Sequence, residues 1–119
     1  MSYDIRLVDP VTKERIVIDD EHHIIGGTYQ IGGTKELWLN ITWNYAKYFY
    51  DLIDKELGIR WLYGKSAVDT IPKLNDVIDK LKDDVDEDYW AATEGNAKQS
   101  LIGLLTLAKM RPDAIWEGD

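Results

Sequence analysis

The chain has 119 residues, of which 14 are lysine or arginine and 22 are aspartate or glutamate, so its formal net charge is −8. This excess of negative charge argues against direct binding to nucleic acid or to an anionic membrane, because both need a basic surface. The absence of cysteine excludes disulfides, thiolate nucleophiles and cysteine-based metal sites.

A chain of this length predicts a single domain, residues 1–119. Its first residues lack the basic and apolar segments of a secretory signal, and no apolar run is long enough to cross a bilayer. We therefore expect a soluble cytoplasmic protein. No motif indicates a cofactor, and the oligomeric state does not follow from the sequence.

Alternation of apolar and polar residues predicts short strands in the first third of the chain. Residues 3–8 form the first strand, and residues 16–18 form a second that should pair with it as a hairpin across the turn at Asp9-Pro10. Further short strands are expected at residues 24–25, 28–31 and 36–41.

Two Gly-Gly-Thr units, residues 26–28 and 32–34, lie among these later strands. Glycine tolerates the positive φ angles of tight turns, so we favour paired turns in a small antiparallel sheet. The alternative is a pair of loops whose amides and Thr28 and Thr34 hydroxyls receive an anion or a peptide, as glycine-rich loops do ahead of a helix. A strand intervenes before the first predicted helix, which weakens this alternative.

An aromatic-rich helix is predicted from Thr42, its N-cap, to Leu57, with Gly58 as a natural C-cap residue. On a helical wheel the apolar side chains, Leu57 included, share one half, which is typical of an amphipathic helix packed on a sheet. Residues 59–63 would then form a short, extended apolar connection to the next helix.

A second helix is predicted to begin near Ser66 or Thr70. Ser66 and Asp69 have the spacing of a capping box, and Pro72 fits the first turn, where its missing amide costs nothing. The buried stripe of this helix is expected to consist of Ile71, Leu74, Ile78 and Leu81.

A third helix is predicted between Thr93, its N-cap, and Pro112, which ends it. Its apolar stripe is wide, so it should be the most buried helix, and the following tail carries Trp116, which we expect to dock on the body of the protein. Strands followed by helices predict an α+β fold: a small antiparallel sheet of three to five strands in the N-terminal third, packed against three C-terminal helices.

No stretch of the sequence indicates catalysis, so we expect a non-catalytic protein. Gly64-Lys65-Ser66 matches only the end of a phosphate-binding P-loop, and a turn followed by a helix cap explains these residues. The residues before them are bulky, whereas a loop that wraps phosphates needs access to its backbone. Residues 84–88 imitate the start of a calcium loop but lack its glycine and its final glutamate. His22 and His23 would point to opposite faces of a strand, so we expect no metal site.

Several segments carry a resemblance to a known family: residues 3–14 (YDIRLVDPVTKE), 26–45 (GGTYQIGGTKELWLNITWNY), 58–65 (GIRWLYGK), 86–90 (DEDYW) and 93–119 (TEGNAKQSLIGLLTLAKMRPDAIWEGD). They resemble small conserved proteins of bacterial genomes and of their phages or prophages. The resemblance covers nearly the whole chain and implies a bacterial or phage origin and a soluble single domain. It brings no assigned activity and no catalytic residues.

The first functional hypothesis is a non-catalytic protein that binds a basic protein partner. An acidic run flanked by aromatic residues would meet a basic surface, and its field would steer the encounter. In a phage setting the partner could be a nucleic-acid-binding host protein, approached by imitation of phosphate charge. Solubility also explains an acidic surface. The predicted partner-binding residues are Asp83, Asp84, Asp86, Glu87, Asp88, Tyr89 and Trp90.

The second hypothesis is a small-molecule or nucleotide-binding domain, which would include an enzyme. Helix N-termini attract anions, and aromatic residues line small-molecule pockets. Polar residues gather near two predicted helix starts and at the Gly-Gly-Thr turns, although helix capping also explains some of them. The predicted ligand-binding residues are Thr28, Thr34, Asn40, Asn44, Thr93, Glu94 and Asn96.

Overall fold

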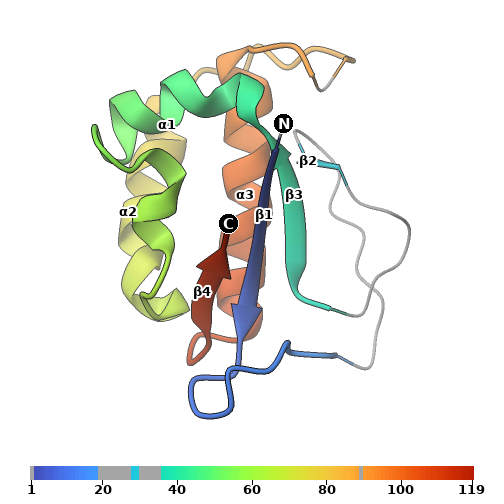
Figure 1. The fold of residues 1–119 in the computed structure, drawn as a ribbon. Helices are drawn as coiled ribbons and strands as arrows, with labels where there is room; N and C mark the ends of the chain where they lie inside the picture. Colours follow the sequence, from blue (N-terminus) through green and yellow to red (C-terminus); the bar gives the residue numbers. More distant parts are fainter. Residues whose placement is uncertain (1, 19–27, 30–35, 89) are drawn as a thin grey trace.

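The computed structural model describes residues 2–18, 28–29, 36–88 and 90–119, and Figure 1 shows its sheet lying in front of the longest helix. Two 3-10 helices, labelled η1 and η2, occur beside the α-helices and strands. In chain order the elements are β1 (Ser2–Val8), β2 (Thr28–Tyr29), β3 (Trp38–Thr42), η1 (Trp43–Tyr45), α1 (Ala46–Leu52), η2 (Gly58–Leu62), α2 (Ala67–Lys80), α3 (Glu94–Met110) and β4 (Ile115–Gly118).

The sheet has the strand order β2-β3-β1-β4, and the pairings between these strands are antiparallel. Ile5 lies opposite Leu39 across β1 and β3, and Leu7 lies opposite Trp116 across β1 and β4. All of these side chains are buried. Because side chains alternate along a strand, the residues between them point to the other face of the sheet, away from the helices.

The predicted α+β class is confirmed, with three antiparallel strands in the N-terminal part and three α-helices after them. The fourth strand, β4, comes from the C-terminal tail and was not predicted. Trp116 does dock on the body of the protein, but it does so as a strand residue paired with β1. The predicted strand at 24–25 and the glycines of both Gly-Gly-Thr units lie outside the described residues.

The predicted hairpin between residues 3–8 and 16–18 is only partly formed. A single bridge joins Val8 to Arg15, whereas Val17 forms its bridge with Glu36 instead. Between them the Asp9 carboxylate accepts hydrogen bonds from the next two main-chain amides beyond the proline, at 2.8 and 3.0 Å. This side chain holds a turn in the backbone, and the second strand therefore meets β1 only at its end.

The predicted helix from Thr42 to Leu57 is wrong in its extent. Its first residues form η1, and α1 ends at Leu52. The Asp54 carboxylate then accepts hydrogen bonds from the amides of the following turn, at 3.0 and 2.7 Å, which redirects the chain and leaves Leu57 50% exposed. Gly58, at φ 59°, begins η2 rather than capping α1, so residues 59–63, predicted to be extended, are mostly helical.

The predicted N-caps of the two later helices are confirmed. Ser66 Oγ accepts a hydrogen bond from the amide of Asp69, and Thr93 Oγ1 accepts one from the amide of Asn96. The placement of Pro72 in the first turn is wrong, because α2 begins at Ala67 and the proline falls in its second turn. In the predicted stripe, Leu74 and Leu81 are buried, whereas Ile71 and Ile78 are only partly buried.

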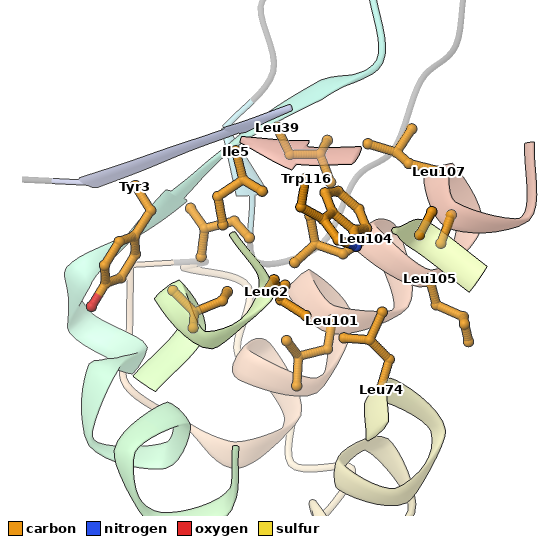
Figure 2. Packing of buried hydrophobic residues seen from close by; sticks show 14 of the residues in the cluster. Tyr3, Ile5, Leu39, Leu62, Leu74, Leu101, Leu104, Leu105, Leu107 and Trp116 are labelled. Atoms are coloured by element: carbon orange, nitrogen blue, oxygen red, sulfur yellow. The ribbon is translucent and has the colours of Figure 1, made fainter. Parts of the chain in front are cut away.

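One hydrophobic core joins the inner face of the sheet to the helices. Figure 2 shows Ile5, Leu39 and Trp116 of the sheet turned toward Leu101 and Leu104 of α3. Most residues of α3 are buried, as the wide apolar stripe predicted. The indole of Trp116 also donates a hydrogen bond of 2.8 Å to a buried threonine hydroxyl of α2, so its polar atom is satisfied inside the core.

Candidate functional site

The acidic run lies in the segment between α2 and α3, which we call the acidic loop (residues 82–92). The loop crosses one end of the molecule, beside the start of α1 (Figure 1). Its described acidic side chains are all exposed; they are Asp83, Asp84, Asp86, Glu87 and Asp88. Val85 and Trp90 are 55% and 45% exposed beside them, and Tyr89, the remaining predicted residue, lies outside the described part of the chain.

Asn96, in the first turn of α3, organises this loop from below. Its side chain is buried, at 1% exposure. Its Oδ1 accepts a hydrogen bond from the amide of Asp86, and its Nδ2 donates to the main-chain oxygens of Asp88 and Ala91, all at 3.0 Å. The backbone groups of a loop without helix or strand need hydrogen-bond partners outside regular secondary structure. In this loop the side-chain amide of Asn96 is the partner of three backbone groups.

Two side chains from the first helical segment bind the far part of the loop. Asn44 Nδ2 donates to the main-chain oxygen of Trp90 at 2.7 Å, and the Tyr48 hydroxyl donates to that of Ala92 at 2.9 Å. These residues are more than forty positions away in sequence. The loop is therefore tied both to α3 and to the η1–α1 segment, which sets its position relative to the sheet.

The start of α3 and the loop also pack directly on each other. Asp84 Oδ1 accepts a hydrogen bond of 2.9 Å from the amide of Gly95, and a carboxylate at a helix N-terminus is favoured by the free amides and by the helix dipole. A Cβ added at Gly95 would lie 2.5 Å from the main-chain nitrogen of Val85. Only a residue without a side chain leaves room for the loop at this position.

Other carboxylates of the run hold the loop locally. Asp86 Oδ1 accepts from the amide of Asp88 at 2.8 Å, and Asp88 Oδ1 accepts from the amide of Trp90 at 3.1 Å. Asp83 forms an ion pair of 2.7 Å with Lys98 of α3. Asp83, Asp86 and Asp88 thus help to hold the loop, since one carboxylate oxygen of each accepts a hydrogen bond from within the protein while the residue remains exposed.

The predicted ligand-binding residues divide between two places. Asn44 and Asn96 both donate hydrogen bonds to the acidic loop, Thr93 caps α3 where the loop ends, and Glu94 is half-buried in the same helix turn. Asn40 lies on β3 instead, where its Nδ2 donates to Asp4 Oδ1 and Ser2 Oγ at 2.6 and 2.7 Å. Thr28 is on β2, although its side chain is not described, and Thr34 lies outside the described residues.

The P-loop-like segment has the structure of a turn and a helix cap. Gly64 has a φ of 85°, and Ser66 caps α2. Lys65 Nζ donates to the main-chain oxygen of Trp61 at 2.6 Å and lies 4.2 Å from the centre of the Trp61 ring. The lysine therefore interacts with its own turn, in a geometry unlike that of a lysine reaching across a phosphate-binding loop.

Sequence reasoning predicted the acidic run but missed the residues that shape it, namely Tyr48, Gly95 and Lys98. Their partners are distant in sequence, and no local pattern marks them. Within the described ranges no three histidine, aspartate or glutamate side chains are grouped so that they could hold a metal; His22 and His23 lie outside those ranges. None of the described helices is long and apolar enough to cross a membrane.

Comparison with known proteins yields no match among family models, curated proteins or solved structures. The distinguishing feature of the candidate site is a set of exposed carboxylates and one exposed tryptophan on a loop whose backbone is held by the buried Asn96 and by Asn44 and Tyr48. An arrangement of this kind can bind a charged surface.

Proposed function

We propose that the protein is a non-catalytic binding protein whose acidic loop docks on a basic surface of a protein partner. The observation that carries this proposal is the buried Asn96 side chain, which forms hydrogen bonds with the loop backbone at Asp86, Asp88 and Ala91. A surface that is ordered before binding loses less conformational entropy when the partner arrives. The exposed carboxylates thus lie on a loop whose backbone is bound to the rest of the protein.

Solubility alone is a weaker explanation of this loop. An acidic surface keeps a small domain soluble wherever the charges are placed, and it needs no buried amide to fix them. Loops of this length without helix or strand are often functional or disordered. Here Asn96, Asn44 and Tyr48 all donate hydrogen bonds to one irregular segment, which favours a function that depends on its shape.

The side-chain composition also suits a protein interface. Tryptophan is enriched among the residues that dominate binding energy, and Trp90 is 45% exposed among the carboxylates. Clustered charges raise the rate of association with an oppositely charged partner, and this attraction weakens as salt screens the charges. We therefore expect a complex with a basic protein that forms quickly and is sensitive to ionic strength.

A pull-down from a bacterial lysate with two matched variants tests the proposal. In the first variant Asp86→Asn, Glu87→Gln and Asp88→Asn remove three charges from the loop but keep the side-chain oxygens that accept its hydrogen bonds. In the control, Asp51→Asn, Glu56→Gln and Asp79→Asn remove the same charge from exposed positions elsewhere. Captured proteins are washed at increasing salt and identified by mass spectrometry.

The expected result is a basic protein that the wild type and the control retain and that the loop variant loses. Direct titration with that purified protein should then show weaker binding as salt rises. Equal retention by the loop variant would contradict the proposal. Equal loss by both variants would also contradict it, since net charge rather than the loop would then be responsible.

A further inference from the structure

The face of the sheet that points away from the helices carries a row of polar side chains with one tryptophan. The strand register places Trp38 of β3 opposite Arg6 of β1, and Arg6 opposite Glu117 of β4. One pair further along, Asp4 lies opposite Asn40. All five side chains are partly buried, so this face is neither a core nor a fully solvated surface.

A groove of about 150 Å³ opens on this face, and the described residues that line it are Asp4, Arg6, Arg15 and Trp38. Arg15 reaches it from the segment that bridges to the end of β1. An engineered protein cavity of about 150 Å³ binds benzene. The groove is therefore large enough for a single six-membered ring, and it is smaller than the pockets of several hundred Å³ that take drug-sized ligands.

The two arginines that line the groove are suited to binding a carboxylate. Arg6 uses Nη2 in its ion pair with Glu117 at 3.2 Å, and Arg15 uses Nη1 in its ion pair with Glu36 at 3.1 Å. A guanidinium has five N–H donors, so such a pair leaves others for a second acceptor. Its planar shape matches a carboxylate, which it binds through paired hydrogen bonds. The Arg15–Glu36 pair is exposed, and exposed ion pairs add little to stability.

We infer that this groove binds a small planar aromatic carboxylate, with its ring beside Trp38 and its carboxylate at the guanidinium groups of Arg6 and Arg15. Offset or edge contacts with an indole favour an aromatic ring. Asp4, held by the 2.6 Å hydrogen bond from Asn40, provides an acceptor for a donor group on that ring. The site lies at the start of β3, whereas the acidic loop contacts the segment after its end, so the two sites are separate.

The test uses the full chain and benzoate as the probe, followed by NMR chemical-shift changes and by calorimetry. Benzoate should saturate a single site and shift the Arg6, Arg15 and Trp38 side-chain signals. Benzamide has the same ring without the charge, and inorganic phosphate has the charge without the ring. Each should bind at least about tenfold more weakly than benzoate, because charge-assisted hydrogen bonds and ring contacts both contribute.

Two variants complete the test. Arg15→Gln should weaken benzoate binding at least about tenfold. Arg111→Gln, which removes a partly exposed arginine paired with Asp113 elsewhere, should leave benzoate binding unchanged. Trp38→Leu should remove the preference for benzoate over phosphate. The inference is overturned if benzoate does not bind, if Arg15→Gln binds it normally, or if phosphate binds equally well. The loop variant of the previous subsection should bind benzoate as the wild type does, so the two proposals fail separately.

Discussion

The side-chain amide of Asn96 donates a hydrogen bond of 3.0 Å to the main-chain oxygen of Asp88. This contact ties the middle of the acidic loop to the first turn of α3. The same side chain binds the loop at Asp86 and Ala91 as well, so a single buried residue supports an irregular segment at three points. The most charged part of the surface thus depends on an uncharged residue beneath it.

Replacing Asn96 with alanine should destabilise the protein by about 2–4 kcal/mol. The change removes three hydrogen bonds, each contributing about 0.5–1.5 kcal/mol, and leaves polar groups of the loop without their partner. Urea unfolding measures the difference. Asn44→Ala is the control, because this exposed residue gives the loop a single hydrogen bond and should cost about 1 kcal/mol or less. Equal effects of the two variants would show that Asn96 has no special role.

Gly95→Ala should also destabilise the protein, against the usual trend. Alanine is favoured over glycine inside a helix by about 1 kcal/mol. Here the added Cβ would approach Val85 N at 2.5 Å and the carbonyl carbon of Asp84 at 2.6 Å, so the loop backbone must move. Thermal unfolding should show a lower Tm, and amide NMR signals of the acidic loop should shift. A higher Tm with an unchanged loop would contradict the packing.

The indole of Trp116 and the hydroxyl of Thr70 form a hydrogen bond of 2.8 Å in the core. Thr70→Val keeps the shape of the side chain but leaves the buried indole N–H without an acceptor, which should cost about 1–3 kcal/mol. Thr70→Ser restores the hydroxyl and should recover much of the loss. Denaturant unfolding of the three proteins measures both differences, and a valine variant as stable as the wild type would contradict this account.

The Tyr63 hydroxyl is buried and has no hydrogen-bond partner among the described residues. An unsatisfied buried polar group costs stability, whereas an apolar atom in the same place does not. Tyr63→Phe should therefore be at least as stable as the wild type near neutral pH. Unfolding in urea at pH 7 measures this, and a clear loss of stability would indicate that the hydroxyl has a partner after all.

The same residue should make stability fall in alkaline solution. Burial, and then the nearby charge of Asp119, raise the pKa of Tyr63 from 10.0 to about 12. Above pH 10 the unfolded chain gives up this proton while the folded protein keeps it, so the folded state binds more protons and stability declines as pH rises. The contribution of the Tyr63 proton to the stability of the folded state is fully present below pH 10 and is lost as pH rises through about 12.

Unfolding free energies of the wild type and Tyr63→Phe, measured between pH 9 and pH 12, test this linkage. Other tyrosines titrate in both proteins, so the difference between the two curves carries the information. Stability of the wild type should fall more steeply than that of the phenylalanine variant in this range. Parallel curves would indicate that Tyr63 titrates equally in the folded and unfolded chains.

Features that depend on near neighbours in the chain could be predicted from the sequence. Alternation identified β1 and β3, because side chains of a strand repeat every two residues. Ser66 and Thr93 were identified as N-caps, because the bonds of a cap span only a few residues. The acidic run was equally visible, since it is continuous in the chain.

Contacts between residues distant in sequence could not be predicted in this way. β4 is short, and its pairing with β1 depends on a partner more than a hundred positions away; no local pattern encodes such a register. Asn96 lies only three positions after Thr93, yet Thr93 caps a helix while Asn96 supports a loop that Asn44 also holds. The sheet-face groove likewise arises because pairing places Trp38 beside Arg6. Hydrogen bonds and packing contacts between separate segments determine these arrangements. Such contacts form only when the chain has folded.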